Sequence, residues 1–236
     1  MAVLRVASFN AHWCLDRRGG DVDLLAVSSA LDADVLCLQE AWRRGDGRAD
    51  HEIVARKLGY ELVEARVPRV HNNTAPAAVR AVDGARSWWG LALLSRYPIG
   101  EVQEYQLGTV IADEADRIAV RARLDVDGTP FTVVFTHLTW RAWGIPMQLW
   151  RLRRDVLAGV STTPAAVMGD FNMWGPFVTA ALPGWRRTAR GRTWPAPRVR
   201  HQLDHILVTR AVQVRDTGIE PYNGSDHLPI RADLEF

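Results

Sequence analysis

Short apolar runs recur along the whole chain, and most are bounded by glycine, proline or aspartate. Runs of about four to eight residues that are rich in valine, isoleucine and leucine are typical of strands buried in a β-sheet. The pattern predicts eight strands: Leu4–Phe9, Val35–Gln39, Leu91–Leu94, Ile118–Val126, Phe131–Thr136, Ala165–Met168, Leu203–Val208 and Leu228–Leu234.

Helical periodicity appears in three segments between these strands, where apolar positions repeat about every 3.6 residues. The predicted helices are Asp21–Leu31, His51–Leu58 and Met147–Val160. Pro146 stands just ahead of the last one, a position that suits proline at a helix start. Two stretches without periodicity, Arg66–Ser87 and Gly184–Arg200, are predicted as loops. Many short strands with a few helices indicate a layered α+β or α/β sandwich, with its functional site on loops at one end of the sheets.

Composition fits one globular domain over residues 1–236, with 47% hydrophobic and 24% charged residues. The first six residues lack the basic stretch and long apolar run of a secretory signal. No apolar window approaches the ~18 residues of a transmembrane helix. We therefore expect a cytoplasmic protein and a monomer. Cys14 and Cys37, each flanked by apolar residues, are predicted to be core residues and not a disulfide.

Charge is nearly balanced, at a formal +2, but the basic residues are almost all arginine, with Lys57 as the sole lysine. Arginine clusters in the second half of the chain suit phosphate recognition, because the guanidinium fork matches two phosphate oxygens. A high GC content of the genome, which favours arginine codons over lysine codons, is an alternative explanation of the same arginine excess. The near-neutral total argues mildly against a high-affinity, non-specific nuclease.

The tetrapeptide Gly169-Asp170-Phe171-Asn172 follows the apolar run Ala165–Met168 and is the most informative motif of the chain. Successive strand side chains alternate faces, so Asp170 and Asn172 project to the same side. A carboxylate there can hold a hard cation, and a carboxamide can hydrogen-bond a phosphate or a nucleophilic water. The motif predicts half of a metal-assisted hydrolytic site.

Two more polar residues stand at predicted strand ends. Asn10 ends the first strand, where it either orients a metal ligand or a phosphate oxygen or simply starts a turn. Glu40 follows the buried strand Val35–Gln39. A carboxylate at the mouth of an apolar strand is costly unless it is solvated or binds a cation.

Three histidines complete the candidate chemistry. His137 follows Phe131–Thr136 and is either a core histidine or a site residue. Asp204-His205 and Asp226-His227 each place an aspartate directly before a histidine. Because neighbouring strand residues point apart, the useful pairing is across the two motifs, from Asp204 to His227. A carboxylate partner fixes the tautomer of a histidine and raises its basicity.

Taken in order, these motifs resemble the endonuclease/exonuclease/phosphatase superfamily over nearly the whole chain. The matching series is Asn10, Gln39-Glu40, Thr136-His137, Gly169-Asp170-Phe171-Asn172, Leu203-Asp204 and Ser225-Asp226-His227. The resemblance implies a four-layered α/β-sandwich, in which two mixed β-sheets pack face to face with helices outside. It also implies a Mg²⁺-dependent attack of water on a phosphate ester; Mn²⁺ is expected to substitute.

The resemblance also implies a role for each matched residue. Glu40 would be the principal metal ligand, with Asn10 beside it and Asp226 near the metal. Asp170 and Asn172 would position water and a phosphate oxygen. His137 would contact the phosphate or assist the leaving group. The remaining catalytic residues would be the pair Asp204 and His227.

In that catalytic pair, His227 would be the general base or the residue that polarises the phosphate, oriented by Asp204. The chain departs from the family pattern at two places. Many relatives carry Asn-x-Asn in the first motif, where this chain has Asn10-Ala11-His12. His205 stands where relatives often have tyrosine or arginine, and we assign it no catalytic role.

The resemblance implies that the substrate is a phosphate ester, with nucleic acid as one candidate. Trp140, Trp143 and Trp174 follow the motifs closely and are predicted to wall the substrate site, where they would stack bases or cover a lipid headgroup. Tryptophans that cap the sandwich core are the alternative, and Trp13 is predicted to be such a core residue.

The main hypothesis is hydrolysis of a phosphodiester, from nucleic acid, a lipid or a small molecule. A second is a phosphomonoesterase or phospholipase-type enzyme of the same fold, acting on a phosphoinositide, a sphingomyelin-like lipid or a small metabolite. A third, a catalytically silent binding module, is disfavoured because every expected acidic and histidine position is filled.

Overall fold

Two six-stranded mixed sheets form the centre of the protein. The computed structural model describes residues 2–67, 87–113 and 115–236, so the predicted loop Arg66–Ser87 falls almost wholly outside the described residues. The first sheet has the strand order β11-β12-β1-β2-β4-β3. Its strands are β1 (Val3–Asn10), β2 (Val35–Arg43), β3 (Glu61–Arg66), β4 (Trp88–Ser95), β11 (Gln213–Ile219) and β12 (Ile230–Glu235).

The second sheet has the order β5-β6-β7-β8-β10-β9. Its strands are β5 (Ile99–Gly108), β6 (Arg117–Val126), β7 (Thr129–His137), β8 (Ala165–Asp170), β9 (Arg186–Arg187) and β10 (Asp204–Val208). Among the described strands, each sheet contains one parallel pair, β1 with β2 and β7 with β8. Parallel neighbours end at the same sheet edge, so these two pairs bring the carboxyl ends of four strands to one end of the molecule.

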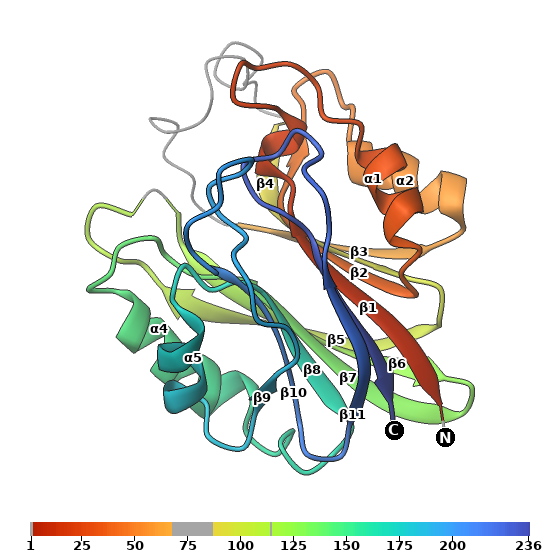
Figure 1. Ribbon diagram of the computed structural model, residues 1–236, viewed down its shortest axis with the longest axis vertical. Coiled ribbons are helices and arrows are strands. Elements are labelled where there is room, and N and C mark those ends of the chain that lie inside the picture. Colours follow the sequence, from red (N-terminus) through yellow and green to blue (C-terminus); the bar gives the residue numbers. More distant parts are fainter. Residues whose placement is uncertain (1, 68–86, 114) are drawn as a thin grey trace.

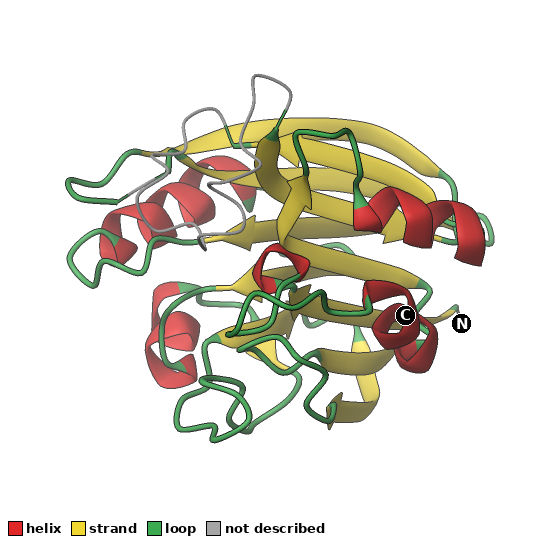
Figure 2. Cartoon of the chain, turned by 90° about the horizontal axis from the view of Figure 1, so that it is seen from above, coloured by secondary structure: helices red, strands yellow, loops and turns green. Residues whose placement is uncertain are grey.

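Helices cover the outer faces of both sheets and complete the expected four-layered α/β-sandwich (Figure 1). Beside the first sheet lie α1 (Leu24–Leu31) and α2 (Asp50–Leu58). Beside the second lie α4 (Ile145–Arg151), which continues as a π-helical turn over Leu152–Val156, and α5 (Gly175–Ala181). Figure 2 shows strands running through the middle of the molecule and most helices nearer its outer edges.

Strand alternation decides which side chains fill which layer. In β7, Phe131, Val133 and Phe135 enter the core between the two sheets, whereas Val134 packs under the helices on the other face. Both cysteines are buried and free, as predicted; Cys37 lies in the core between the sheets and Cys14 under α1 and α2. No helix in the described ranges is both long enough and apolar enough to cross a membrane.

Four strands were absent from the sequence prediction, and all four lie at sheet edges: β3, β5, β9 and β11. An edge strand pairs with a neighbouring strand on one side only, and its other side is open to solvent. Many of its residues are therefore polar and exposed, so it lacks the continuous apolar run that marks a central strand. In β5, for example, most side chains are exposed or half-buried. The first helix also begins later than predicted, at Leu24, because the Asp23 carboxylate accepts a hydrogen bond from the Ala26 amide and caps it.

Candidate active site

The carboxyl ends of the four parallel strands open into a pocket of about 490 Å³. Eight of its lining residues are polar or charged, and the others are mainly aromatic. The lining consists of His12, Trp13, Glu40, Trp89, Ala115, Arg117, His137, Trp140, Asp170, Asn172, Trp194, Leu203, Asp226 and His227. Most of the predicted site residues therefore lie in one pocket, although they come from distant parts of the chain.

Glu40 reaches the pocket through a break in its own strand. The register between β2 and β4 shifts between Gln39 and Ala41, and Glu40 has a left-handed backbone conformation with a φ of 56°. Such a conformation costs about 1–3 kcal/mol for a residue other than glycine and persists only where the surroundings impose it. Its Oε2 atom is buried and accepts no hydrogen bond from any described residue. Burial raises the pKa of this carboxyl group, an effect that the nearby His12 opposes.

Asn10 connects the two carboxylates on either side of the pocket. Its Nδ2 donates to Glu40 Oε1 at 3.3 Å and to Asp170 Oδ2 at 3.1 Å. Its Oδ1, the atom that would ligate a metal, accepts a hydrogen bond from the backbone amide of His12 at 3.1 Å. Asn10 thus fixes the spacing between the first sheet's glutamate and the second sheet's aspartate.

The Gly169-Asp170-Phe171-Asn172 segment depends on a very close approach of β8 to β7. Gly169 has a φ of 147°, and a Cβ atom there would lie 1.9 Å from the Thr136 carbonyl oxygen, so no side chain fits. In this register Asp170 stands beside His137. Asp170 Oδ1 accepts from the Asn172 amide at 2.8 Å, and Asn172 Nδ2 donates to the Leu138 carbonyl at 3.0 Å.

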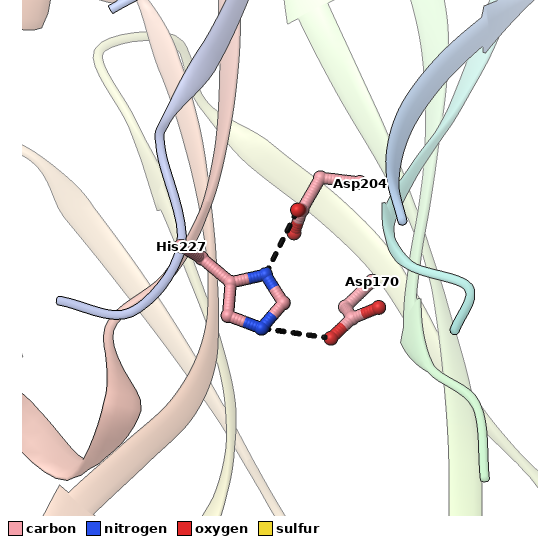
Figure 3. A group of neighbouring side chains, drawn as sticks. All are labelled: Asp170, Asp204 and His227. Carbon is pink, nitrogen blue, oxygen red and sulfur yellow. Dashed lines mark hydrogen bonds and ion pairs between the residues drawn. The ribbon is translucent and has the colours of Figure 1, made fainter. Parts of the chain in front are cut away.

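His227 lies between two buried carboxylates (Figure 3). Its Nδ1 is 2.8 Å from Asp204 Oδ2, which confirms the pairing predicted from strand alternation, and its Nε2 is 3.6 Å from Asp170 Oδ2. Burial alone would lower the pKa of His227, but the charges of Asp204 and Asp170 outweigh it and raise that pKa to about 10. Burial in turn raises the pKa of Asp170 to about 7. The three side chains form a continuous row of two carboxylates with an imidazole between them.

Ser225 ties the loop that carries His227 to the first sheet. Its hydroxyl donates to the Asn10 carbonyl at 2.8 Å and accepts from the His227 amide at 3.1 Å. The motif Ser225-Asp226-His227 is therefore positioned by its own first residue, and both Asp226 and His227 line the pocket.

His137 ends β7 and lines the pocket from the second sheet's side. Burial, together with the positive charges of Arg117 and His227, holds its pKa well below the usual range, so the ring is neutral. Its Nε2 lies 3.3 Å from Asn172 Nδ2 and 3.5 Å from Asp170 Oδ2. His205, which directly follows Asp204, does not line the pocket. It is buried on the other face of β10, and its Nε2 lies 2.8 Å from the Met173 carbonyl oxygen.

The donor atoms suit a hard cation. Asp170, Asp204 and His227 offer ligand atoms within 4.8 Å of one another and form a possible metal site. A second set of donors lies at Glu40 and Asp226, whose Oε2 and Oδ1 atoms are buried without a hydrogen-bond partner in the described part of the chain. Buried carboxylate oxygens are costly unless paired, and metal ligation supplies that pairing.

Arg117 is a pocket residue that sequence reasoning missed. It is 4% exposed, and its guanidinium forks onto Asp113 with two 3.0 Å hydrogen bonds. Its Cζ lies 5.4 Å above the ring of Trp89, while Nη1 is buried and finds no hydrogen-bond acceptor among the described residues. A buried guanidinium in the lining of a polar pocket, with one nitrogen that no described residue accepts from, is suited to bind a phosphate oxygen. No local motif marks this arginine, because only strand pairing brings it beside His137.

The three tryptophans predicted as substrate walls occupy different positions. Trp140 lines the pocket and is 46% exposed. Trp143 and Trp174 are more exposed, at 64% and 54%, and do not line it. Trp174 stacks on His201, which stacks on Trp194, and Trp194 lines the pocket and donates its Nε1 hydrogen to Asp226 Oδ2 at 3.1 Å.

Trp13, predicted to be a core residue, belongs to the core between the sheets and also forms part of the pocket wall. It stacks on Trp89, with ring centroids 5.4 Å apart. Trp13, Trp89 and Trp194 were not predicted as wall residues, because an aromatic residue in a loop gives the same sequence signal whether it faces a core or a pocket.

A model of the endonuclease/exonuclease/phosphatase family matches residues 7–227, which include every motif of the pocket. The chain belongs to this family. It is therefore an enzyme of the phosphoesterase class, as the motif series implied. No curated protein sequence matches the chain significantly.

Solved structures share this fold at low sequence identity. An endonuclease/exonuclease/phosphatase from Beutenbergia cavernae has a TM-score of 0.77 and 22% identity over 100% of this chain and 72% of its own. The human Nocturnin catalytic domain, solved with a bound sulfate anion, has a TM-score of 0.73 and 21% identity over 100% and 94%. A mannosyl-6-phosphatase from Bacteroides thetaiotaomicron has a TM-score of 0.70 and 17% identity over 99% and 100%. At these identities the likeness shows the fold alone.

Proposed function

We propose that this protein is a Mg²⁺-dependent phosphodiesterase that hydrolyses its substrate by attack of water on phosphorus. The observation that carries the proposal is the row Asp204–His227–Asp170, which shares one pocket with Glu40, whose Oε2 accepts no hydrogen bond from any described residue. An imidazole between two carboxylates, in one pocket with a cation site, is the arrangement that metal-assisted hydrolysis needs.

Glu40 and Asp226 would hold the cation, because each presents a buried carboxylate oxygen without a hydrogen-bond partner in the described residues. When bound there, Mg²⁺ neutralises charge on the phosphate oxygens. Asn10 keeps this site at a fixed distance from Asp170 by bonding to both carboxylates. The distance from metal ligand to water-positioning group is therefore set before substrate arrives.

Asp170 orients the attacking water and accepts its proton, while Asn172 helps to fix the position of that carboxylate. His227 donates from Nε2 to a non-bridging phosphate oxygen, because its Nδ1 hydrogen is already held by Asp204. His137, neutral and bonded near Asn172, contacts the phosphate or the leaving group. Arg117 Nη1 supplies a further donor to the phosphate. Each group acts from a position that the fold has already fixed.

A phosphodiester substrate, with nucleic acid as one candidate, agrees with aromatic planes on several sides of the pocket. Trp13, Trp89, Trp140 and Trp194 all line it. Such planes stack on bases or sugars on either side of a phosphate, and each stacked base contributes about 1–3 kcal/mol to binding. Trp143 and Trp174 would extend these walls outward, along an exposed surface, to a longer substrate.

The experiment is an activity panel with purified protein in Mg²⁺, in Mn²⁺ and in EDTA. Bis-p-nitrophenyl phosphate, plasmid DNA, single-stranded DNA, RNA and a lipid phosphodiester are compared with p-nitrophenyl phosphate. We expect metal-dependent hydrolysis of at least one diester, abolished by EDTA and by Glu40→Gln. Faster cleavage of the monoester than of every diester would replace the proposal with a phosphomonoesterase. No hydrolysis of any compound would indicate a binding module.

A further inference from the structure

The stretch that contains β9 and leads to β10 concentrates positive charge. This arginine segment (residues 186–202) holds six arginines: Arg186, Arg187, Arg190, Arg192, Arg198 and Arg200. No aspartate or glutamate occurs between Asp170 and Asp204. The formal net charge of +2 for the whole chain therefore hides one strongly basic stretch.

The arginines of this segment lack the acidic partners that many other arginines have. Elsewhere in the described chain, ion pairs with carboxylates are formed by Arg5, Arg43, Arg44, Arg48, Arg96, Arg117, Arg154, Arg215 and Arg231. Within the described residues, no arginine of the segment forms one, and all except Arg187 are exposed. Burial and the positive charge of Arg190 lower the pKa of Arg187. Codon preference does not explain the missing acidic residues of this one stretch, whose charge is available to an anionic ligand.

The segment has a defined conformation that reaches the pocket. In its first half, the Gln202 side chain accepts from Arg187 Nη1 at 3.2 Å and donates to the Ala189 carbonyl at 3.1 Å. In its second half, Trp194 and His201 exchange two backbone hydrogen bonds, at 2.8 and 2.9 Å, which close a hairpin. Trp194 lines the pocket, so the hairpin that follows it belongs to the pocket rim.

A row of aromatic rings leads from this hairpin to the surface. The His201 ring stacks on Trp194, with centroids 6.2 Å apart, and on Trp174, at 5.6 Å; the interplanar angles are 25° and 15°. Trp174 in turn contacts Phe177, and both of these rings are more than half exposed. The row begins in the pocket wall and ends in exposed aromatic surface.

Arginine and exposed ring surface are neighbours at the outer end of the row. Gly175 directly follows Trp174, and a Cβ atom at Gly175 would lie 1.6 Å from Arg187 Nη1. Arg187 therefore lies against the start of α5, the helix that also carries Phe177. At the inner end, Arg200 directly precedes His201 on the hairpin.

We propose that the arginine segment and the ring row bind single-stranded nucleic acid, one phosphate of which occupies the pocket. The arginines would contact further phosphates of the strand, and the exposed rings of Trp174 and Phe177 would stack on its bases. Basic side chains beside aromatic rings bind a single strand with little regard to sequence, because every base has a flat face. The inference rests on the proposed function, since it names the polymer whose phosphodiester is hydrolysed.

An anionic membrane surface fits these observations less well. Peripheral proteins that use basic residues for membrane binding also insert apolar side chains beside them. No large apolar side chain within the arginine segment is exposed. The nearly parallel ring planes match the way in which aromatic side chains stack on successive bases of a strand.

The test is fluorescence anisotropy of a labelled single strand of about 20 nucleotides, DNA or RNA, longer than the site of one folded module. Binding to the full chain is measured in EDTA, without hydrolysis, over a range of salt concentrations. The double variant Arg198→Gln, Arg200→Gln is compared with Arg56→Gln, Arg210→Gln. The latter is the matched control, because Arg56 and Arg210 are exposed and form no ion pair within the described residues.

We expect log affinity to fall less steeply with log salt concentration in the Arg198→Gln, Arg200→Gln variant, by about 1.4, since each phosphate contact on a single strand contributes about 0.7. The control should keep the wild-type slope. Trp174→Ala should weaken binding about fivefold or more through loss of stacking, with an unchanged slope. A duplex of the same length should bind more weakly than the single strand, because its bases are already stacked on one another.

Circular dichroism and a thermal melt check that each variant is folded. Equal salt slopes in the two double variants would overturn the proposal, and so would duplex binding as tight as single-strand binding. Vesicles of phosphatidylcholine and phosphatidylserine are the second probe. If the wild type binds these vesicles but no oligonucleotide, the segment is a membrane-binding surface. Failure of the proposed function looks different, since the chain would then bind the oligonucleotide in EDTA but hydrolyse no diester in Mg²⁺.

Discussion

The interior between the two sheets and the pocket at their carboxyl ends are built from the same strands, yet they differ in almost every physical property. Along β7, Phe131, Val133 and Phe135 are fully buried and meet other apolar side chains. Two residues further on, His137 keeps the same facing but enters a pocket in which buried nitrogen and oxygen atoms lack hydrogen-bond partners within the described chain. The interior stabilises the fold, whereas the pocket keeps unsatisfied groups for a ligand.

Backbone conformation follows the same division. The pocket is lined by Glu40, Asn172, His12 and Trp13, all with positive φ, and Gly169, with its very close contact to Thr136, directly precedes the lining residue Asp170. Strain of this kind gathers where the chain must aim side chains at a reaction, and the cost is offset by packing elsewhere. The comparison teaches that substitutions in the two regions should separate activity from stability.

The largest effect is expected at the pocket, from Asp170→Asn. This change keeps the side chain's shape but removes the carboxylate that positions water, so the turnover number should fall about 10²–10⁴-fold. The melting temperature should shift by only a few degrees. Steady-state kinetics and a thermal melt measure the two quantities. Asp233→Asn, which removes a partly exposed ion pair with Arg5 on β1, is the matched control and should keep full activity. Equal turnover in both variants would contradict the assignment of Asp170.

The converse change is Phe131→Ala in the interior. Phe131 is fully buried and packs against Phe236 with ring centroids 4.6 Å apart. Removing its ring should lower the free energy of unfolding by about 3–5 kcal/mol, measured by urea denaturation. Turnover per folded molecule should stay at the wild-type value at low temperature. A selective loss of turnover without loss of stability would show that the two regions are not separable.

Arg117→Met tests the buried guanidinium that adjoins both regions. Loss of a preorganised donor to a charged phosphate should lower kcat/KM about 10²–10³-fold. Arg117→Lys keeps the charge but not the fork onto Asp113, so it should recover part of that loss. An Arg117→Met enzyme with unchanged kcat/KM would mean that Arg117 only supports the pocket wall beside Trp89.

The smallest effect concerns the two thiols. Burial raises the pKa of Cys14 and of Cys37 above the ordinary value, so neither forms the reactive thiolate at pH 8 in the native protein. Native protein should react with a disulfide reagent far more slowly than protein in urea, and the rate should rise with pH. Single-cysteine variants separate the two sites. Cys14, which is itself part of the strained turn from His12 to Cys14, should react through local opening, and Cys37 only on global unfolding. A faster reaction at Cys37 than at Cys14 would contradict this order and show that the core between the sheets opens more readily than the turn.

Prediction from sequence succeeded for strands whose own residues form a continuous apolar run. The central strands have continuous apolar runs because they are covered on both faces, and all eight predicted strands overlap strands of the two sheets. The edge strands β3, β5, β9 and β11 were missed because one side of each strand is exposed to solvent. Solvent exposure favours polar residues, which interrupt the apolar run that predicts a strand. The pairing of Asp204 with His227 was predictable, since alternation excludes the neighbouring residue as a partner.

The sequence by itself determined that the chain makes apolar strands ending in carboxylates, amides and histidines, because local periodicity and motif order need no knowledge of distant neighbours. Only the tertiary structure decided that Arg117 stands beside His137, that Asn10 joins Glu40 to Asp170, and that His12 lines the same pocket as Glu40. Those relations join residues up to 160 positions apart. They follow from sheet register and from a strained turn, which no short stretch of sequence encodes.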